Sequence, residues 1–343
     1  MHDIFKFKFM GARVIKTGLA VLITAWICLL LELPAIFAVI TAIVSIERTA
    51  SDSIRKGLIR FPASAIGAAV SISFAYMFGE SAMTYAFAAT LTIIICNSLK
   101  LQEGALVAVL TAVAMVPSIE SQYLLTFLSR LGTTSIGLFI ATIVNIAILP
   151  PKFTGLINTK LDSLFIASST VLKESIEQIL NQEIKYTKSA SKTYLKLREG
   201  GDDVLKLSRA QRQEWKYHKV KKKDLRKFYD SQKRLNLLER IILHLGNLQY
   251  MNQKVEFTPE QKNLIENLLE SMVKILQDEK HQIPDNHYLY IDELDIRFKY
   301  QSNKQPSNQE QFYHHFTPIV IIFYELLSLH DTLEELEQLV RSE

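Results

Sequence analysis

The chain has 343 residues, with 39 lysines and arginines against 35 aspartates and glutamates, and the resulting formal net charge of +4 by itself decides little. Two cysteines, Cys28 and Cys96, both inside apolar runs, exclude a disulfide-rich secreted scaffold. Residues 1–150 hold only 10 of the basic and 7 of the acidic side chains. This asymmetry predicts a transmembrane domain over 1–150 and a polar domain over 151–343.

The first sixteen residues interleave Phe5, Phe7 and Phe9 with basic side chains, a pattern typical of a short helix at the cytoplasmic interface of a membrane. No cleavable signal peptide is evident, because the first apolar run lacks an A-x-A-like end. Six apolar runs follow, at about 17–31, 35–46, 61–78, 82–96, 104–116 and 124–149. They suit six helices across a ~30 Å hydrocarbon layer, although the second and fifth runs need flanking residues.

Basic residues mark every second loop of this region. Lysines and arginines cluster before the first run, over 48–60, at Lys100 and over 152–160, whereas the intervening loops carry acidic residues. These acidic residues are Glu32, Glu80 and Glu120. Because cytoplasmic loops carry the excess of positive charge, we expect the amino terminus and residues 151–343 in the cytoplasm.

A sequence repeat relates two parts of the apolar region. RFPASAIG over 60–67 matches RLGTTSIG over 130–137, and AVITA over 38–42 matches AVLTA over 108–112 at the same offset of seventy residues. We interpret the pair as one three-helix unit used twice. Three spans in each copy place the second copy upside down, an inverted repeat of the kind that puts substrate sites of many carriers between the copies.

The repeat aligns two arginines, Arg60 and Arg130. Arg60 begins the third run at its cytoplasmic end, and a positive-inside anchor explains it equally well. Arg130 lies in the outer third of the sixth run, where an unpaired charge costs at least ~2.5 kcal/mol, so it should face protein or water. Because a guanidinium fork suits a carboxylate, we predict that both arginines bind an anionic substrate.

Other polar residues of 1–150 are weaker candidates for the same site. Asn97 and Asn145 are predicted to contact substrate, although an interfacial cap explains Asn97 and a neighbouring helix could satisfy Asn145. Lys16, Arg55 and Lys56 are predicted to attract the anion at the inner mouth. Small residues around Gly67 and Gly137 favour close helix packing. Six spans make a thin wall for a pore, so we expect a homo-oligomer, most simply a dimer.

Three motifs carry a resemblance to a known family: IKTGLAV over 15–21, SDSIRKGLIRFPASAIGA over 51–68, and RLGTTSIG over 130–137. With them, residues 1–150 resemble the aromatic acid exporter family of bacterial membrane proteins, itself related to the fusaric acid resistance proteins. Residues 151–343 are similar to the helical domain of one branch of that family. The resemblance implies efflux of organic anions, often aromatic carboxylates, and related plant malate channels imply conduction past basic residues.

Beyond Pro150-Pro151 the chain is predicted to be all-α. Apolar residues recur at helical spacing over 156–180, and further amphipathic stretches follow at about 189–214, 221–250, 259–279 and 308–341. A break is expected from Ile283-Pro284 to Pro306-Ser307. The simplest architecture is a cytoplasmic bundle of four or five antiparallel helices.

A basic stretch over 206–234 holds twelve lysines and arginines against three acidic residues. It is predicted to contact anionic lipid or a cytosolic partner through Lys219, Lys221, Lys222, Lys223, Arg226 and Lys227. A solvated helix face is the commoner explanation of such a run, and nucleic acid is a poorer one because no binding motif accompanies it. The alternative to a transporter is therefore a non-transporting membrane anchor that senses or binds a partner.

Enzyme motifs are missing from the sequence. It contains no GxxxxGKS/T, GxGxxG or GxSxG, and its histidines lack metal-ligand spacing. We therefore expect no enzyme activity, metal or cofactor. Without a phosphate-binding loop, transport would be driven by an ion gradient or a partner, or would be passive.

Overall fold

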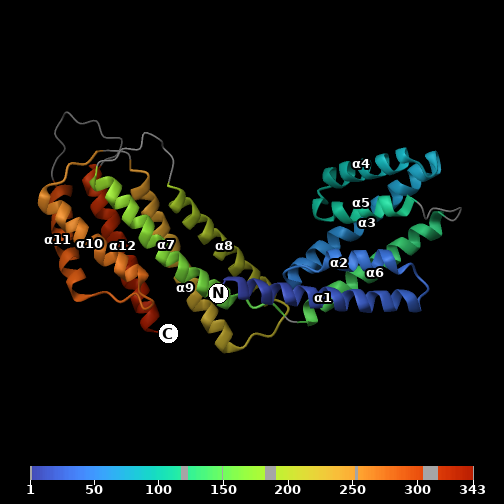
Figure 1. Cartoon of the computed structure of the whole chain (residues 1–343), viewed down its shortest axis with the longest axis horizontal. Helices are drawn as coiled ribbons and strands as arrows, with labels where there is room; N and C mark the ends of the chain where they lie inside the picture. Colours follow the sequence, from blue (N-terminus) through green and yellow to red (C-terminus); the bar gives the residue numbers. More distant parts are fainter. Residues whose placement is uncertain are drawn as a thin grey trace. The chain divides into compact units, whose positions relative to one another are not determined.

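The computed structural model describes residues 2–116, 123–148, 150–181, 191–251, 254–303 and 316–342, with side chains from Gly11 onward. Within these ranges the chain is all-α, as predicted, with twelve helices and no strand (Figure 1). It divides into two compact units. The first comprises Met1–Lys152 together with Ala210–Lys219, and the second comprises Phe153–Arg209 and Val220–Glu343.

Six helices build most of the first unit: α1 (His2–Leu30), α2 (Ala35–Ser45), α3 (Ala50–Phe78), α4 (Ala82–Ser98), α5 (Gln102–Met115) and α6 (Tyr123–Ala147). Local chemistry sets several of their ends. The Thr49 side chain caps α3 by accepting from the Asp52 N–H, and Gly79 ends that helix at φ +61°, a conformation that favours glycine. The predicted interfacial segment begins α1 without a break, but the side chains of Phe5, Phe7 and Phe9 lie outside the described residues.

Three of these helices are long and apolar enough to cross a membrane: residues Gly11–Leu30 of α1, α3 and α6. The other three are apolar but shorter, with 11 residues in α2, 17 in α4 and 14 in α5. Large apolar side chains face outward on these helices, and Leu22, Trp26 and Phe139 are each more than 60% exposed. Because a soluble protein rarely exposes such a continuous apolar surface, the first unit is a membrane domain.

The first unit contains two groups of three helices, the first with one small core and the second with two. Ala20 of α1, Ala42 of α2 and Ala141 of α6 pack together in one group. The other group is formed by α3, α4 and α5, and α3 also packs against α6. Each group thus combines the first two helices of one sequence copy with the third helix of the other copy.

Two glycines permit the closest of these helix contacts. A side chain on Gly67 of α3 would collide with the carbonyl oxygen of Ala108 in α5, and one on Gly137 of α6 would collide with the carbonyl oxygen of Ala38 in α2. Gly67 and Gly137 are seventy residues apart, as are Ala38 and Ala108. The repeated motifs therefore make equivalent backbone contacts.

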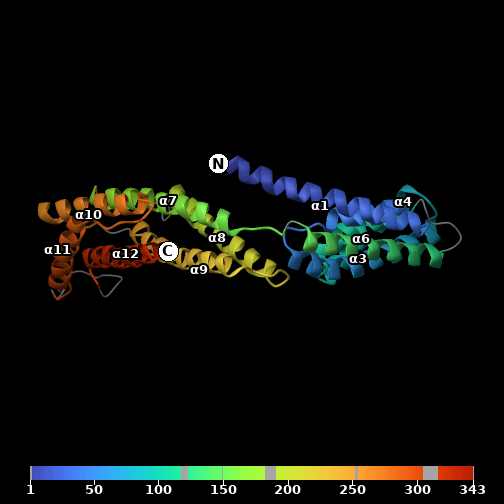
Figure 2. The ribbon, with the colours of Figure 1, turned by 90° about the horizontal axis from the view of Figure 1, so that it is seen from below.

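The second unit is built from α7 (Thr154–Leu180), most of α8 (Lys192–Glu214), α9 (Lys222–Gln249), α10 (Pro259–Gln277), α11 (Asp285–Ser302) and α12 (Pro318–Arg341). Helix α7 packs against α9 and α10, and α9 packs against α12. Figure 2 shows α7 and α10 in one layer and α9 and α12 in another, with α11 crossing at the end of the bundle.

The structure has helix α11 where the sequence predicted a break between Ile283 and Ser307, so that prediction was wrong. The sequence prediction missed it because its apolar residues do not gather on one face. Ile291 and Leu294 are buried, whereas Leu289, Ile296 and Tyr300 are exposed. The bundle therefore has more helices than the four or five expected.

Candidate functional site

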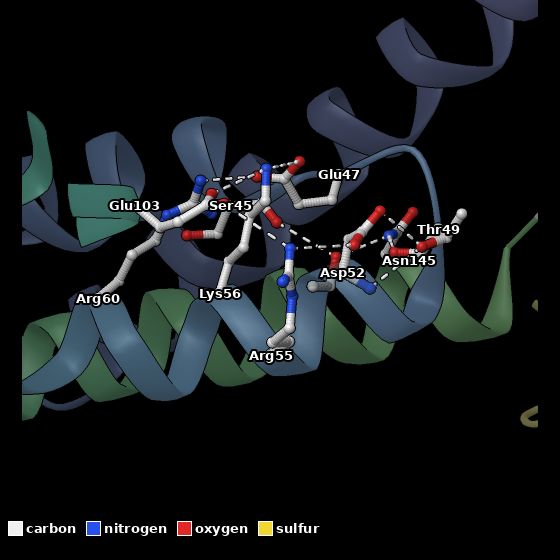
Figure 3. Close-up of polar contacts among 10 residues, drawn as sticks. Ser45, Glu47, Thr49, Asp52, Arg55, Lys56, Arg60, Glu103 and Asn145 are labelled. Atoms are coloured by element: carbon white, nitrogen blue, oxygen red, sulfur yellow. Dashed lines mark hydrogen bonds and ion pairs between the residues drawn. The ribbon is translucent and has the colours of Figure 1, made fainter. Parts of the chain in front are cut away.

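Arg60 lies in α3 with its side chain buried, and its counter-charge comes from the segment between α2 and α3. Its Nη2 donates to Oε1 of Glu47 at 2.6 Å. Lys56, one turn earlier on the same face of α3, donates to Oε2 of the same carboxylate at 3.2 Å. Figure 3 shows both basic side chains reaching from α3 toward Glu47. One carboxylate therefore serves two cations.

The network around Arg60 extends to α5 and is electrically balanced. Glu103 of α5 lies 3.2 Å from Lys56 Nζ and 3.7 Å from Arg55, and Arg55 also lies 3.7 Å from Asp52. The network joins three bases, Arg55, Lys56 and Arg60, to three acids, Glu47, Asp52 and Glu103. The charges of Arg55 and Lys56, which were expected to attract an anion, are thus already matched by carboxylates.

Arg130 lies in α6 and is only 4% exposed, yet its surroundings differ from those of Arg60. Its Nη2 donates to the hydroxyl of Thr111 in α5 at 2.6 Å, and its guanidinium carbon lies 4.1 Å from the centre of the Phe37 ring. Among the described residues its Nε and Nη1 are buried with no hydrogen-bond partner, as are the same two nitrogens of Arg60, so the difference between the arginines is the ion pair. Among the residues that the structure describes, Arg130 has no carboxylate within ion-pair distance.

A series of buried hydroxyl groups leads from Arg130 to the place where α3 and α6 pack together. Ser64 Oγ of α3 lies 3.0 Å from Thr111 Oγ1 and 3.2 Å from Thr134 Oγ1 of α6. Ser64 and Thr134 occupy the fifth position of the two repeated motifs. The guanidinium is therefore held by neutral polar groups, which orient it without neutralising its charge.

Asn145 and Lys16 are hydrogen-bonded to each other. Lys16 Nζ donates to the backbone oxygen of Asn145 at 3.2 Å and to its Oδ1 at 2.9 Å. The amide nitrogen of Asn145 donates to the Thr49 carbonyl at 3.1 Å and to Ser53 Oγ at 2.7 Å. These bonds hold α1, α3 and α6 together, which is the neighbouring-helix interpretation left open by the sequence.

The remaining predicted residues lie elsewhere. Asn97 is exposed at the end of α4, where its carbonyl accepts from the Lys100 N–H, and no described contact links it to Arg130. The six basic residues predicted to meet lipid or a partner are all exposed and have no ion pair within the described part of the chain. The described residues also contain no group of three or more histidine, cysteine, aspartate or glutamate side chains arranged to hold a metal.

The sequence prediction missed Phe37, Glu47 and Thr111. Thr111 could have been found, because it is the threonine of the repeated AVLTA motif and Thr41 is its counterpart. Glu47 is the one carboxylate between residues 33 and 51, in a loop otherwise counted for its basic residues. Nothing in the sequence around Phe37 connects it to an arginine 93 positions later.

Known proteins resemble the chain over nearly its full length. The profile of aromatic acid exporter family member 1 matches residues 8–148. A UPF0421 protein from Bacillus cereus (strain ATCC 10987 / NRS 248) is 40% identical, covering 99% of this chain and 96% of the relative. UPF0421 proteins from Halalkalibacterium halodurans and Staphylococcus aureus are 38% and 34% identical, covering 98% and 95% of this chain and 92% and 98% of their own lengths. The resemblance read from the motifs is confirmed: residues 8–148 match the aromatic acid exporter family, and the chain belongs to the UPF0421 family.

Proposed function

We propose that the protein transports small organic anions, in particular aromatic carboxylates, out of the cytoplasm. Membership of an exporter family and a domain of exposed apolar helices support transport across a membrane. The single observation that supports an anionic substrate is Arg130, a buried guanidinium with no described counter-charge.

A carboxylate fits the vacant donors of Arg130. Its Nε and Nη1 carry hydrogens that no described atom accepts, and charged hydrogen bonds to carboxylates are among the strongest in proteins. A bound carboxylate would also give Arg130 a negative counter-charge, as Glu47 does for Arg60. The carboxylate follows from this chemistry, whereas the aromatic part of the substrate rests on the family.

We also propose that all six apolar helices span the cell membrane as an inverted repeat. In support, the packing of α3 on α5 corresponds to that of α6 on α2, and the packing of α1 on α2 corresponds to that of α4 on α5. Alternating loop charges favour a cytoplasmic amino terminus and a cytoplasmic second unit. A homodimer completes the proposal, with the exposed apolar faces of the first unit as the contact.

Export from proteoliposomes loaded with hydroxylated benzoates, with and without an imposed pH gradient, tests this function. Arg130→Gln should lower the export rate at least tenfold, because a bound anion loses its charged contact, worth about 1.5–3 kcal/mol. Arg48→Gln is the matched control, since it removes the same charge from an exposed position, and should export like the parent. Equal rates for Arg130→Gln and the parent would remove the arginine from the mechanism.

A second function is favoured by the start of α9. Lys222, Lys223, Arg226 and Lys227 are exposed there beside exposed Leu225 and Tyr229, a combination that suits an anionic lipid surface. A membrane anchor that only docks in this way should carry no anion in vesicles. Its docking is measurable in nanodiscs, where phosphatidylglycerol should slow trypsin cleavage at these lysines relative to phosphatidylcholine alone.

A further inference from the structure

Residues Ala210–Lys219 pack with the first unit although the chain on either side belongs to the second. Two of its side chains make contacts with α3 and α6. Oε2 of Glu214 accepts the N–H of Ala50, the first residue of α3, at 2.8 Å. Nε2 of His218 lies 2.8 Å from the carbonyl oxygen of Ile146, in the last turn of α6. Glu214 is only 1% exposed, so its carboxyl group lies inside the first unit.

The hydrogen bonds of His218 fix where its protons lie. A carbonyl oxygen can only accept, so Nε2 must carry the proton that it donates to Ile146. Nδ1 of the same ring faces two oxygens of Glu214, the backbone carbonyl at 3.1 Å and Oε1 at 3.3 Å. A neutral ring beside an ionised carboxylate would therefore point a lone pair at two acceptors.

The attached arrangement consequently needs one more proton than a neutral histidine and an ionised glutamate contain. The proton lies either on Nδ1, giving an imidazolium–carboxylate pair, or on Oε1, which lies 3.3 Å from Nδ1. In both cases the pair carries no net charge. Released into water, the same two groups hold that proton only below the ordinary histidine pKa of about 6.5.

Two charged groups on other helices face the pair. Lys16 of α1 favours the ionised form of Glu214, and Asp52 of α3 opposes it. Burial has the larger effect and raises the pKa of Glu214 above its ordinary value. The hydrogen bonds of the attached state need the shared proton and the released state does not, so the attached state binds the proton more tightly. Attachment is therefore strongest at low pH and weakens as the pH rises through the pKa of the attached pair.

We propose that Glu214 and His218 form a proton-binding latch that holds Ala210–Lys219 against α3 and α6 and closes the inner end of the anion path. Closure places a tethered carboxylate beside Lys16 and the start of α3, the positive groups that an incoming anion would meet first. A rise in cytoplasmic pH removes the shared proton and exposes these groups. The gating step rests on the proposed transport function, whereas the proton-dependent attachment does not.

Cysteine accessibility tests the latch in the full-length protein. Ala50 is 1% exposed and its N–H is bonded to Glu214 of the segment, and the two buried cysteines, Cys28 and Cys96, are replaced by alanine. Ala50→Cys in that background is labelled with a membrane-impermeant maleimide in nanodiscs between pH 6 and pH 8.5. Rates are divided by those of Lys280→Cys, an exposed position outside the basic start of α9, to remove the pH dependence of the thiol itself. The relative rate should rise at least tenfold over this range.

Two further substitutions should act in opposite directions. Glu214→Gln provides an amide N–H that donates to Nδ1 without an added proton, so Ala50→Cys should stay protected at every pH. His218→Ala removes the attachment to α6 and should leave Ala50→Cys labelled at every pH. Equal labelling of the two variants, or pH-independent labelling of the parent, would overturn the latch.

If a variant fails to insert into the membrane, the latch can still be tested by hydrogen–deuterium exchange of the backbone amides of residues 210–219 in the unmodified protein. After correction for the intrinsic exchange rate, protection should be greater at pH 6 than at pH 8.5, and unchanged protection would overturn the proposal. Measurement of anion flux distinguishes gating by the latch from the transport function itself. A working latch with flux equal in both variants contradicts gating, and no flux in the parent or any variant contradicts the transport function.

Discussion

Arg60 and Arg130 begin the same motif in the two sequence copies and are nearly equally buried, at 6% and 4% exposure, but they differ in their partners. Glu47 lies 2.6 Å from Arg60. Seventy residues after Glu47 the sequence has Pro117, and Arg130 has only hydroxyl and ring contacts among the described residues. A buried arginine in a repeat is therefore not by itself a binding site. The missing counter-charge distinguishes the candidate site from the structural ion pair.

The largest effect is expected when Glu47 is removed. Glu47→Gln leaves Arg60 and Lys56 without their shared carboxylate, and breaking a buried pair from one side costs about 3–5 kcal/mol. Because Glu47 is partly exposed, we expect the lower end, about 3 kcal/mol of the unfolding free energy. Denaturant titration in mixed micelles measures it.

The double variant Glu47→Gln, Arg60→Gln is the control for this loss. It removes both charges, so most of the stability should return, and the double-mutant cycle should show a coupling of about 1–3 kcal/mol between the two residues. Additive losses would mean that the ion pair is not what stabilises this end of α3.

The two copies should respond alike where they pack alike. Gly67→Ala and Gly137→Ala each push a methyl group onto a backbone carbonyl and should each cost about 1–3 kcal/mol of unfolding free energy. Gly132→Ala, which has open space around it, should gain up to about 1 kcal/mol from helix propensity. Tolerance of one glycine substitution but not the other would contradict the equivalence of the copies.

A smaller effect of opposite sign is expected at the two arginines. Arg130→Gln removes a charge worth at least ~2.5 kcal/mol of unfavourable burial, and it loses one hydrogen bond of about 1.5 kcal/mol and a ring contact of at least about 0.5 kcal/mol, so the protein should be stabilised by up to about 0.5 kcal/mol. Arg60→Gln should instead destabilise it, because Glu47 loses its main partner. The same sign for both substitutions would remove the distinction between the two sites.

Sequence reasoning reached the fold class and the helices whose apolar residues form one run or one face. It also identified Arg130, because a charge inside an apolar run is visible without a structure. It missed α11, whose apolar residues are distributed around the helix, and it left both an anion contact and a neighbouring-helix contact open for Asn145. The fold of α11 and the contacts of Asn145 both depend on which elements pack against them.

The partners of the arginines were beyond the sequence for the same reason. Phe37 and Glu47 meet Arg130 and Arg60 only after α2 and α3 have packed with their neighbours. The assignment of Ala210–Lys219 to the first unit was also hidden, because the segment continues an amphipathic helix of the second unit. The spacing of apolar residues shows which face of a helix is buried, but it does not show which element packs against that face.

The most direct test of the missing counter-charge is ligand-induced stabilisation, which needs no transport. A ligand at one hundred times its Kd stabilises the state that binds it by about 2.7 kcal/mol. Benzoate at a saturating concentration should therefore raise the melting temperature of the parent and of the double variant Glu47→Gln, Arg60→Gln. It should not raise that of Arg130→Gln, and uncharged benzamide should stabilise none of them. Equal stabilisation of Arg130→Gln and the parent by benzoate would contradict the account.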